Sequence, residues 1–219
     1  MARVTSTFRR GVRLGVPFAV VGFVLSLSFG VLATQAGFSR LQAMVTSTIV
    51  FAGSAQFAAL AIVAAGGGIG AAVAAGAMMN SRYLAMGIAL APSLPGGVLR
   101  RVLTGQVVVD SSWVLANRGD GTFDRGLLLG TSAPQYVAWV AGTVVGVYAG
   151  DVIGEPGRFG LDAVFPTFFL GLLITELADR RRRVAALLGG GIALARVPFT
   201  PAGVPVLVAA AAAIIGLRA

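Results

Sequence analysis

Long apolar stretches alternate with short polar ones along the whole chain. A helix that crosses a bilayer needs about 20 mostly apolar residues. Stretches that approach this criterion lie at 14–33, 42–65, 69–91, 100–117, 127–149, 161–178, 184–197 and 203–217. The pattern predicts an all-α polytopic membrane protein with about seven or eight transmembrane helices, some of them broken or re-entrant.

Three of these stretches are weak, so the sequence leaves open whether they cross the bilayer fully. Gln106 and Asp110 interrupt the stretch at 100–117, and those at 184–197 and 203–217 are short. The spans and their short loops occupy the chain without room for a soluble domain. We therefore expect a single transmembrane domain over residues 1–219.

A weak internal similarity suggests a repeat. Pro17 precedes Phe51 by 34 residues, and Pro134 precedes Phe165 by 31. Two parallel three-helix repeats at 11–92 and 126–197, joined by a helix at 100–117, would explain this spacing. Chance similarity between hydrophobic stretches explains it equally well.

The amino-acid composition indicates that most of the protein surface faces lipid. Hydrophobic residues make up 57% of the chain, charged residues 11%, and the mean hydropathy is +0.88. A soluble domain carries about 25% charged residues. The chain has no cysteine, histidine or lysine, so we expect no catalytic site, no metal site and no cofactor.

The arginines predict the orientation in the cell membrane. With a cytoplasmic N-terminus, the inner side receives Arg3, Arg9, Arg10, Arg13, Arg118, Arg125, Arg180, Arg181, Arg182, Arg183 and Arg218. The outer side then receives Arg40, Arg100, Arg101, Arg158 and Arg196. This excess fits the positive-inside rule. The net charge of +9 is thus a topology signal, and we expect no nucleic-acid partner.

Polar residues interrupt the second and third apolar stretches. Gly53 and Ser54 lie just before Gln56, and Ser and Gln inside hydrocarbon must find partners within the protein. Local unwinding at Gly53 would make a site for a polar, amphoteric ligand. The alternative is that Gln56 ties two helices together.

Asn80 and Arg82 lie within the third stretch, at membrane depth. An arginine there is costly unless it is paired or hydrated. Asp110 is the natural partner, since it is the one carboxylate near the middle of a predicted span. The pair could be a structural bridge, or it could bind a zwitterion or carry a proton, with Asp110 as the proton carrier.

Gly142, Gly146 and Gly150 recur every four residues in the fifth stretch. Such a stripe on one helix face lets a second backbone approach closely. We expect it to pack against another helix of this chain or against a separate subunit.

Ordered sequence blocks resemble the AzlC family, the large subunit of two-component branched-chain amino-acid exporters. The blocks are GVPFAVVGFVLSLSFGVLA (15–33), FAGSAQFAALAIVAAG (51–66), NSRYLAMGIALAP (80–92), VVVDSSWVLA (107–116), WVAGTVVGVYAG (139–150) and FGLDAVFPTFFLGLLI (159–174). Family residues match at Gly53, Gln56, Asn80, Arg82 and Asp110. Two positions differ from the family pattern: Tyr83 replaces a common histidine, and Ser111 replaces a common glutamate.

The resemblance implies an exporter of hydrophobic amino acids, driven by protons. It also implies a small AzlD-like membrane subunit as partner. Asp110 would then act in proton coupling without the histidine or glutamate of its relatives. A passive channel or a structural membrane subunit without transport of its own stays an alternative.

Overall fold

The computed structural model describes residues 2–153, 157, 160–177, 180–201 and 204–209. Its elements are α1 (Ala2–Gln35), α2 (Arg40–Val50), α3 (Gly53–Ala64), α4 (Ile69–Asn80), α5 (Arg82–Leu90), α6 (Val98–Gln106), α7 (Asp110–Ala116), α8 (Arg125–Ile153), α9 (Leu161–Glu176), α10 (Arg180–Arg196) and α11 (Val204–Ala209). A short 3₁₀ turn covers Ala91–Ser93. The described part contains helices and no strand, apart from one isolated β-bridge, so the predicted all-α class is confirmed.

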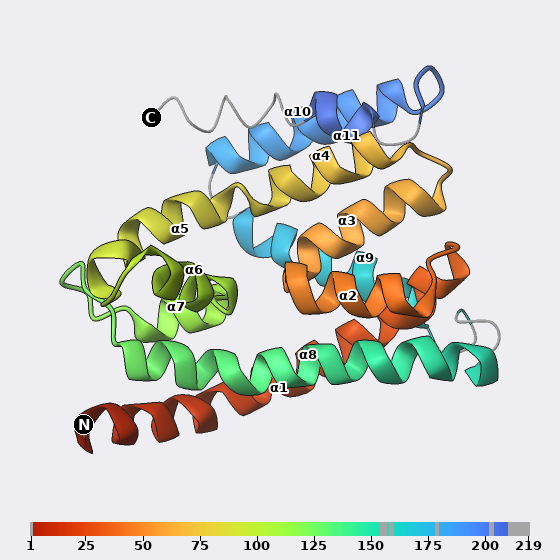
Figure 1. Ribbon diagram of the computed structural model, residues 1–219. Helices are drawn as coiled ribbons and strands as arrows, with labels where there is room; N and C mark the ends of the chain where they lie inside the picture. Colours follow the sequence, from red (N-terminus) through yellow and green to blue (C-terminus); the bar gives the residue numbers. More distant parts are fainter. Residues whose placement is uncertain (1, 154–156, 158–159, 178–179, 202–203, 210–219) are drawn as a thin grey trace.

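The two longest helices, α1 and α8, lie side by side and run in the same direction (Figure 1). Small residues let their backbones approach closely. A Cβ added at Gly11 would lie 2.8 Å from the carbonyl oxygen of Leu127, and one at Gly30 would lie 2.9 Å from the amide nitrogen of Val147. A Cβ at Gly142 or Gly146 would collide with the α1 backbone. The glycine stripe therefore faces α1, within the same chain.

The chain reverses direction between α2 and α3. Phe51 adopts the left-handed region, with φ of 38°, which is strained for a residue with a side chain. The side-chain amide of Gln56 then reaches back to Ser47 Oγ at 3.2 Å, although a straight helix would separate these residues by about 13 Å. Ala36 and Ala64, before and after the pair, line the same cavity. α2 and α3 thus form a helical hairpin.

α6 and α7 form a second hairpin, which starts from the opposite end of the molecule. The backbone N–H of Phe123, after α7, donates to Ser93 Oγ, before α6, at 3.1 Å. Both ends of this hairpin therefore meet where α1 and α8 begin (Figure 1). Asp124 accepts from the N–H of Leu127 at 3.0 Å and caps the start of α8.

In chain order, α4 and α5 come between the two hairpins. They follow one another from one end of the molecule to the other (Figure 1). The helix is interrupted at Ser81, whose N–H bonds to the carbonyl of Met78 at 3.2 Å. This segment differs from the hairpins because its direction continues after the break. It connects the end where α1 finishes to the end where α1 begins.

The structure thus differs from two predicted spans, 42–65 and 100–117, since each contains a hairpin that doubles back. A hydropathy pattern reports how apolar a stretch is, and it contains no information on direction. The second hairpin also moves Arg100 and Arg101 from the predicted outer side to the end that carries Arg118 and Arg125. This placement strengthens the charge asymmetry expected from the positive-inside rule.

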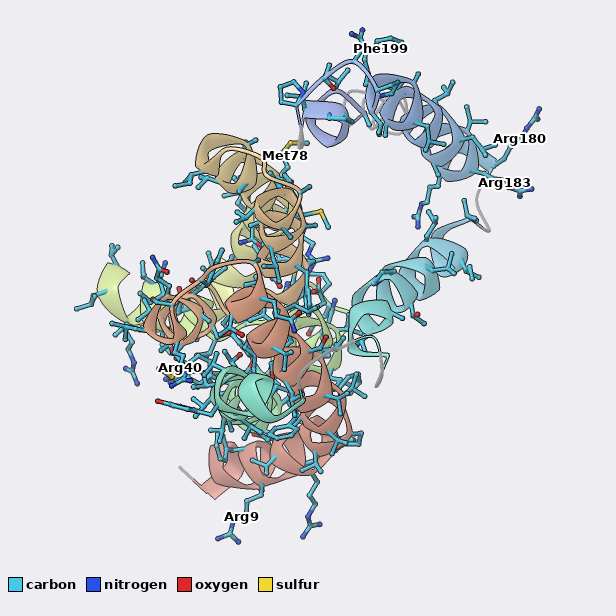
Figure 2. All side chains as sticks on the ribbon, turned by 90° about the vertical axis from the view of Figure 1, so that its right-hand side faces the viewer. Arg9, Arg40, Met78, Arg180, Arg183 and Phe199 are labelled. Atoms are coloured by element: carbon cyan, nitrogen blue, oxygen red, sulfur yellow. The ribbon has the colours of Figure 1, made fainter. Side chains whose placement is uncertain are left out.

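α9, α10 and α11 form a more open part of the molecule. α9 lies against α1, and α11 packs on α10 and α4. Figure 2 shows α10, with Arg180 and Arg183 at its start, set apart from the helices α1–α8. Large apolar side chains on it, including Leu187 and Leu194, are exposed. Such surfaces suit contact with lipid or with another membrane protein.

Among the described residues, one helical segment, Ser6–Gln35, is long and apolar enough by itself to cross a bilayer. The hairpins and the interrupted α4–α5 segment divide the other apolar stretches into shorter helices. The number of crossings therefore stays a prediction. The boundaries of the two repeats also stay a prediction, as does the part of the last span beyond residue 209.

Candidate functional site

The two hairpin tips meet the interruption of α4–α5 in the middle of the molecule. The side-chain amide of Gln106, at the end of α6, donates to the backbone carbonyl of Ile49, at the end of α2. A cavity of about 370 Å³, here called the tip cavity, lies between them. Its lining includes Phe51, Asn80, Gly105, Gln106 and Val108. Three interruptions of regular helix therefore converge on one place.

Arg82 joins these three segments at that place. Its Nη2 lies 3.0 Å from Asp110 Oδ2, at the start of α7, and donates to Ser54 Oγ, at the start of α3, at 3.2 Å. The Arg82 and Asp110 side chains are 41% and 52% exposed in this chain. The predicted Arg82–Asp110 pair thus forms, and its partial exposure leaves room for a ligand or water.

The first turn of α3 adds partial positive charge beside Arg82. Its N-cap residue, Ala52, provides no side-chain hydrogen bond. The first N–H groups of a helix lack partners within that helix and carry the positive end of its dipole. Since Arg82 bonds to Ser54 in this turn, a guanidinium and free backbone donors lie together, a combination that favours an anionic group.

Gln56 belongs to a separate, buried network. Its Oε1 accepts from the indole N–H of Trp139 at 2.9 Å, and its amide donates to Ser47 Oγ at 3.2 Å. Ser47 Oγ is 2.7 Å from Thr143 Oγ1. Gln56 is 3% exposed. The glutamine therefore links α3 to α2 and α8, as in the packing alternative. Gln56 also lines a neighbouring cavity.

Gly53 is adjacent to the same network. A Cβ at this position would lie 2.6 Å from Cη2 of Trp139, so the indole occupies the space that a side chain would need. Local unwinding was expected at Gly53. The helix is instead interrupted at Phe51 and Ala52, and Gly53 is the first residue of α3. Gly53 thus allows Trp139 to reach Gln56.

Replacing Gln56 with leucine is expected to destabilise the protein, because the Trp139 N–H loses its buried acceptor. An unsatisfied buried polar group costs about 1–3 kcal/mol. The double variant Gln56→Leu/Trp139→Phe, which removes both partners, should recover part of that loss. Thermal unfolding of the detergent-purified protein checks this, and additive effects of the two changes would contradict the coupling.

A larger cavity of about 690 Å³ lies between α2, α3 and α4 and is here called the apolar cavity. Most of its wall is aliphatic, as at Ala59, Val63 and Val73. Asn80 lines both this cavity and the tip cavity. Its buried Oδ1 has no hydrogen-bond partner. Because a buried acceptor without a donor is costly, this atom suits a donor supplied by a ligand or water.

The sequence reasoning missed the partners of Gln56. Trp139 and Thr143 belong to the fifth apolar stretch, and Ser47 lies in the second. Trp139 and Thr143 are four residues apart, so they share a helix face, and this spacing was the one available signal. The hydroxyl of Ser111 donates to Gln135 Oε1 at 2.9 Å. Tyr83 lies beside Arg82, with its ring centroid 5.2 Å from the guanidinium carbon.

The described residues contain no group of three or more His, Cys, Asp or Glu side chains that could hold a metal ion. Polar contacts instead concentrate where hairpins from opposite ends meet at an interrupted helix. This arrangement defines a class of helical membrane protein with irregular backbone gathered around an internal polar site. Such backbone is tolerated at membrane depth where protein or a water-filled cavity surrounds it.

The chain belongs to the AzlC family, described as AzlC protein, whose pattern matches residues 17–153. It is similar to the inner membrane protein YgaZ of Escherichia coli, with 26% identity over 89% of this chain and 84% of that protein. It is also similar to an uncharacterised membrane protein of Archaeoglobus fulgidus, with 30% identity over 87% of this chain and 85% of the relative.

A third relative is the branched-chain amino acid transport protein AzlC of Bacillus subtilis, with 22% identity over 89% of this chain and 77% of that protein. Two of these relatives are named as membrane proteins, which supports the membrane location predicted from composition. No solved structure matches the chain.

Proposed function

We propose that the protein is the large subunit of a secondary exporter for branched-chain or other hydrophobic amino acids. It is proton-coupled and works with a small AzlD-like membrane subunit in the cell membrane. The observation that carries this proposal is the Arg82 guanidinium, placed between Asp110 and Ser54 where the hairpin tips meet. Its family and its transport-named relative from Bacillus subtilis support the substrate class.

The carboxylate of the amino acid binds at Arg82 and the first turn of α3. Arg82 uses Nη2 for both Ser54 and Asp110, and a guanidinium has five N–H donors in a planar fork that matches a carboxylate. Gly53 and Ser54 are the first two residues of α3, whose free N–H groups face the same anion.

The ammonium group of the substrate binds Asp110 and the unpartnered Oδ1 of Asn80. Both groups accept hydrogen bonds, and Asp110 also supplies a compensating charge. The branched side chain then extends into the apolar cavity, whose wall near Asn80 includes Ala55, Gln56 and Ala77. A cavity of about 690 Å³ is large enough for an aliphatic side chain.

Asp110 couples transport to protons. A proton that binds Asp110 removes the negative charge that holds the substrate ammonium, so the proton and the substrate compete for this carboxylate. This competition links proton binding to substrate binding by differential affinity. The family resemblance implies a histidine and a glutamate where this chain has Tyr83 and Ser111, so Asp110 is the carboxylate that we assign to this step.

The transport assay uses cells that lack their own exporter and express this protein with its small partner. They are loaded with a valine- or isoleucine-containing dipeptide, and external amino acid is followed over time. We expect saturable efflux that a protonophore abolishes and that Asn80→Leu reduces about tenfold, since a lost bond to a charged group costs about 1.5–3 kcal/mol.

Met79→Leu is the matched control, because the neighbouring side chain makes no polar contact in the site. Its efflux should equal that of the unaltered protein. If cells without either subunit release every apolar amino acid as fast as cells that express both, the substrate assignment is wrong. Efflux that does not saturate and ignores the protonophore would indicate a channel instead.

A further inference from the structure

A third cavity, of about 830 Å³, lies at the end of the molecule where α1 and α8 begin. It is enclosed by the segment Pro92–Pro95, the first turn of α6 and the loop from Arg118 to Gly126, and is here called the loop cavity. The proposed transport site uses none of these residues. Three arginines line the cavity, at positions 101, 118 and 125.

The charges that line this cavity are not balanced, since its lining includes three arginines and one aspartate. Asp124 is the carboxylate in its lining, and it is paired with Arg118 at 2.9 Å. Burial raises the pKa of Asp124, but the Leu127 N–H and the Arg118 guanidinium outweigh this effect and hold its pKa below the ordinary value. Arg101 donates from Nε to the neutral carbonyl of Gly96, and Arg125 makes no ion pair within the described residues.

Aliphatic side chains lie next to these unbalanced charges. Val98 and Leu99, in the first turn of α6, are 80% and 72% exposed, and Leu103 one turn later is 62% exposed. Arg101 lies in the same helix and lines the cavity. A molecule that satisfies this surface needs an anionic head for the cavity and a hydrocarbon part for α6.

We propose that the loop cavity binds the phosphate-bearing headgroup of an anionic phospholipid, with its acyl chains along α6. The guanidinium groups of Arg101 and Arg125 hold the phosphate, which matches their planar fork. The cavity lies at the arginine-rich end of the molecule, where a leaflet with anionic lipids attracts basic residues. The bound headgroup joins the α6–α7 hairpin to the start of α8.

This proposal is independent of the transport function, and lipid retention tests it. The purified protein is reconstituted in nanodiscs with equal phosphatidylglycerol and phosphatidylcholine, released in mild detergent, and weighed by native mass spectrometry. Arg101→Gln/Arg125→Gln should lower the ratio of retained phosphatidylglycerol to phosphatidylcholine about thirtyfold, since each of the two basic residues near the surface contributes about 1 kcal/mol.

Arg9→Gln/Arg10→Gln is the matched control, because it removes the same charge from the exposed start of α1 at the same end of the molecule. It should keep the lipid ratio. Equal loss in both double variants would overturn the proposal, because it would indicate general attraction to the surface. Thermal stabilisation by inorganic phosphate without selective lipid retention would also overturn it.

A third variant protects the test against misfolding. Arg101→Lys/Arg125→Lys keeps the charge that orients the protein but removes the planar fork. If the glutamine variant does not insert, the lysine variant decides. A lower phosphatidylglycerol ratio in it supports the proposal, and an unchanged ratio overturns the arginine site.

Discussion

Replacing Arg82 with methionine is expected to reduce amino-acid efflux to about a tenth or less while the protein stays in the membrane. Methionine preserves the apolar stem of arginine, so packing of α5 changes little. It removes the donor to Ser54 and the partner of Asp110. Truncating one member of a hydrogen-bonded charge pair costs about 2–5 kcal/mol, and the partial exposure of this pair places the effect at the lower end.

Efflux of a loaded dipeptide, normalised to the amount of protein in the membrane, measures this result. Arg40→Met is the control, since it removes an arginine near Tyr148 that lies outside the site. Normal efflux in Arg82→Met would show that the guanidinium does not hold substrate.

Replacing Asp110 with asparagine should allow exchange of amino acid across the membrane without proton-driven accumulation outside the cell.

Replacing Gly142 with alanine is expected to force α1 and α8 apart and to lower the thermal stability of the protein. The added carbon would meet the Ser26 hydroxyl and the carbonyl of Phe23, and backbone cannot move as a flexible side chain can. Overpacking of this kind costs about 1–3 kcal/mol, and contact with backbone favours the upper part of this range.

Gly22→Ala is the matched control on the opposing helix. A Cβ there would meet the Trp139 ring at 3.8 Å, which is an ordinary contact. Scanning fluorimetry in detergent compares the two variants with the unaltered protein. Equal melting temperatures for all three proteins would show that α1 and α8 do not pack as closely as the structure indicates.

The all-helical class and the central ion pair could be predicted from sequence because each follows from a single energetic rule. A chain with 11% charged residues cannot cover itself in water, and an arginine at membrane depth requires a partner. Asp110 was the carboxylate available near mid-span, and the structure places it 3.0 Å from Arg82.

The direction of the helices could not be predicted in the same way. Phe51 adopts a left-handed backbone conformation that the sequence does not signal, since glycine or asparagine usually marks such a position. The role of Gln56 was also ambiguous, because its partner Trp139 lies 83 residues away and only the packing of α8 brings them together. Pairing across such a distance depends on tertiary structure.

The most direct test of the site is whether its two hairpins enter from opposite sides of the membrane. The chain has no cysteine, so single cysteines at Arg40, Gly68, Gly97 and Asp120 can be labelled with an impermeant maleimide from either side. Hairpins predict that positions 40 and 68 react only from outside and positions 97 and 120 only from inside. Straight spans over 42–65 and 100–117 would place Gly68 inside and Gly97 outside, and that result would contradict the convergence of Ser54, Arg82 and Asp110.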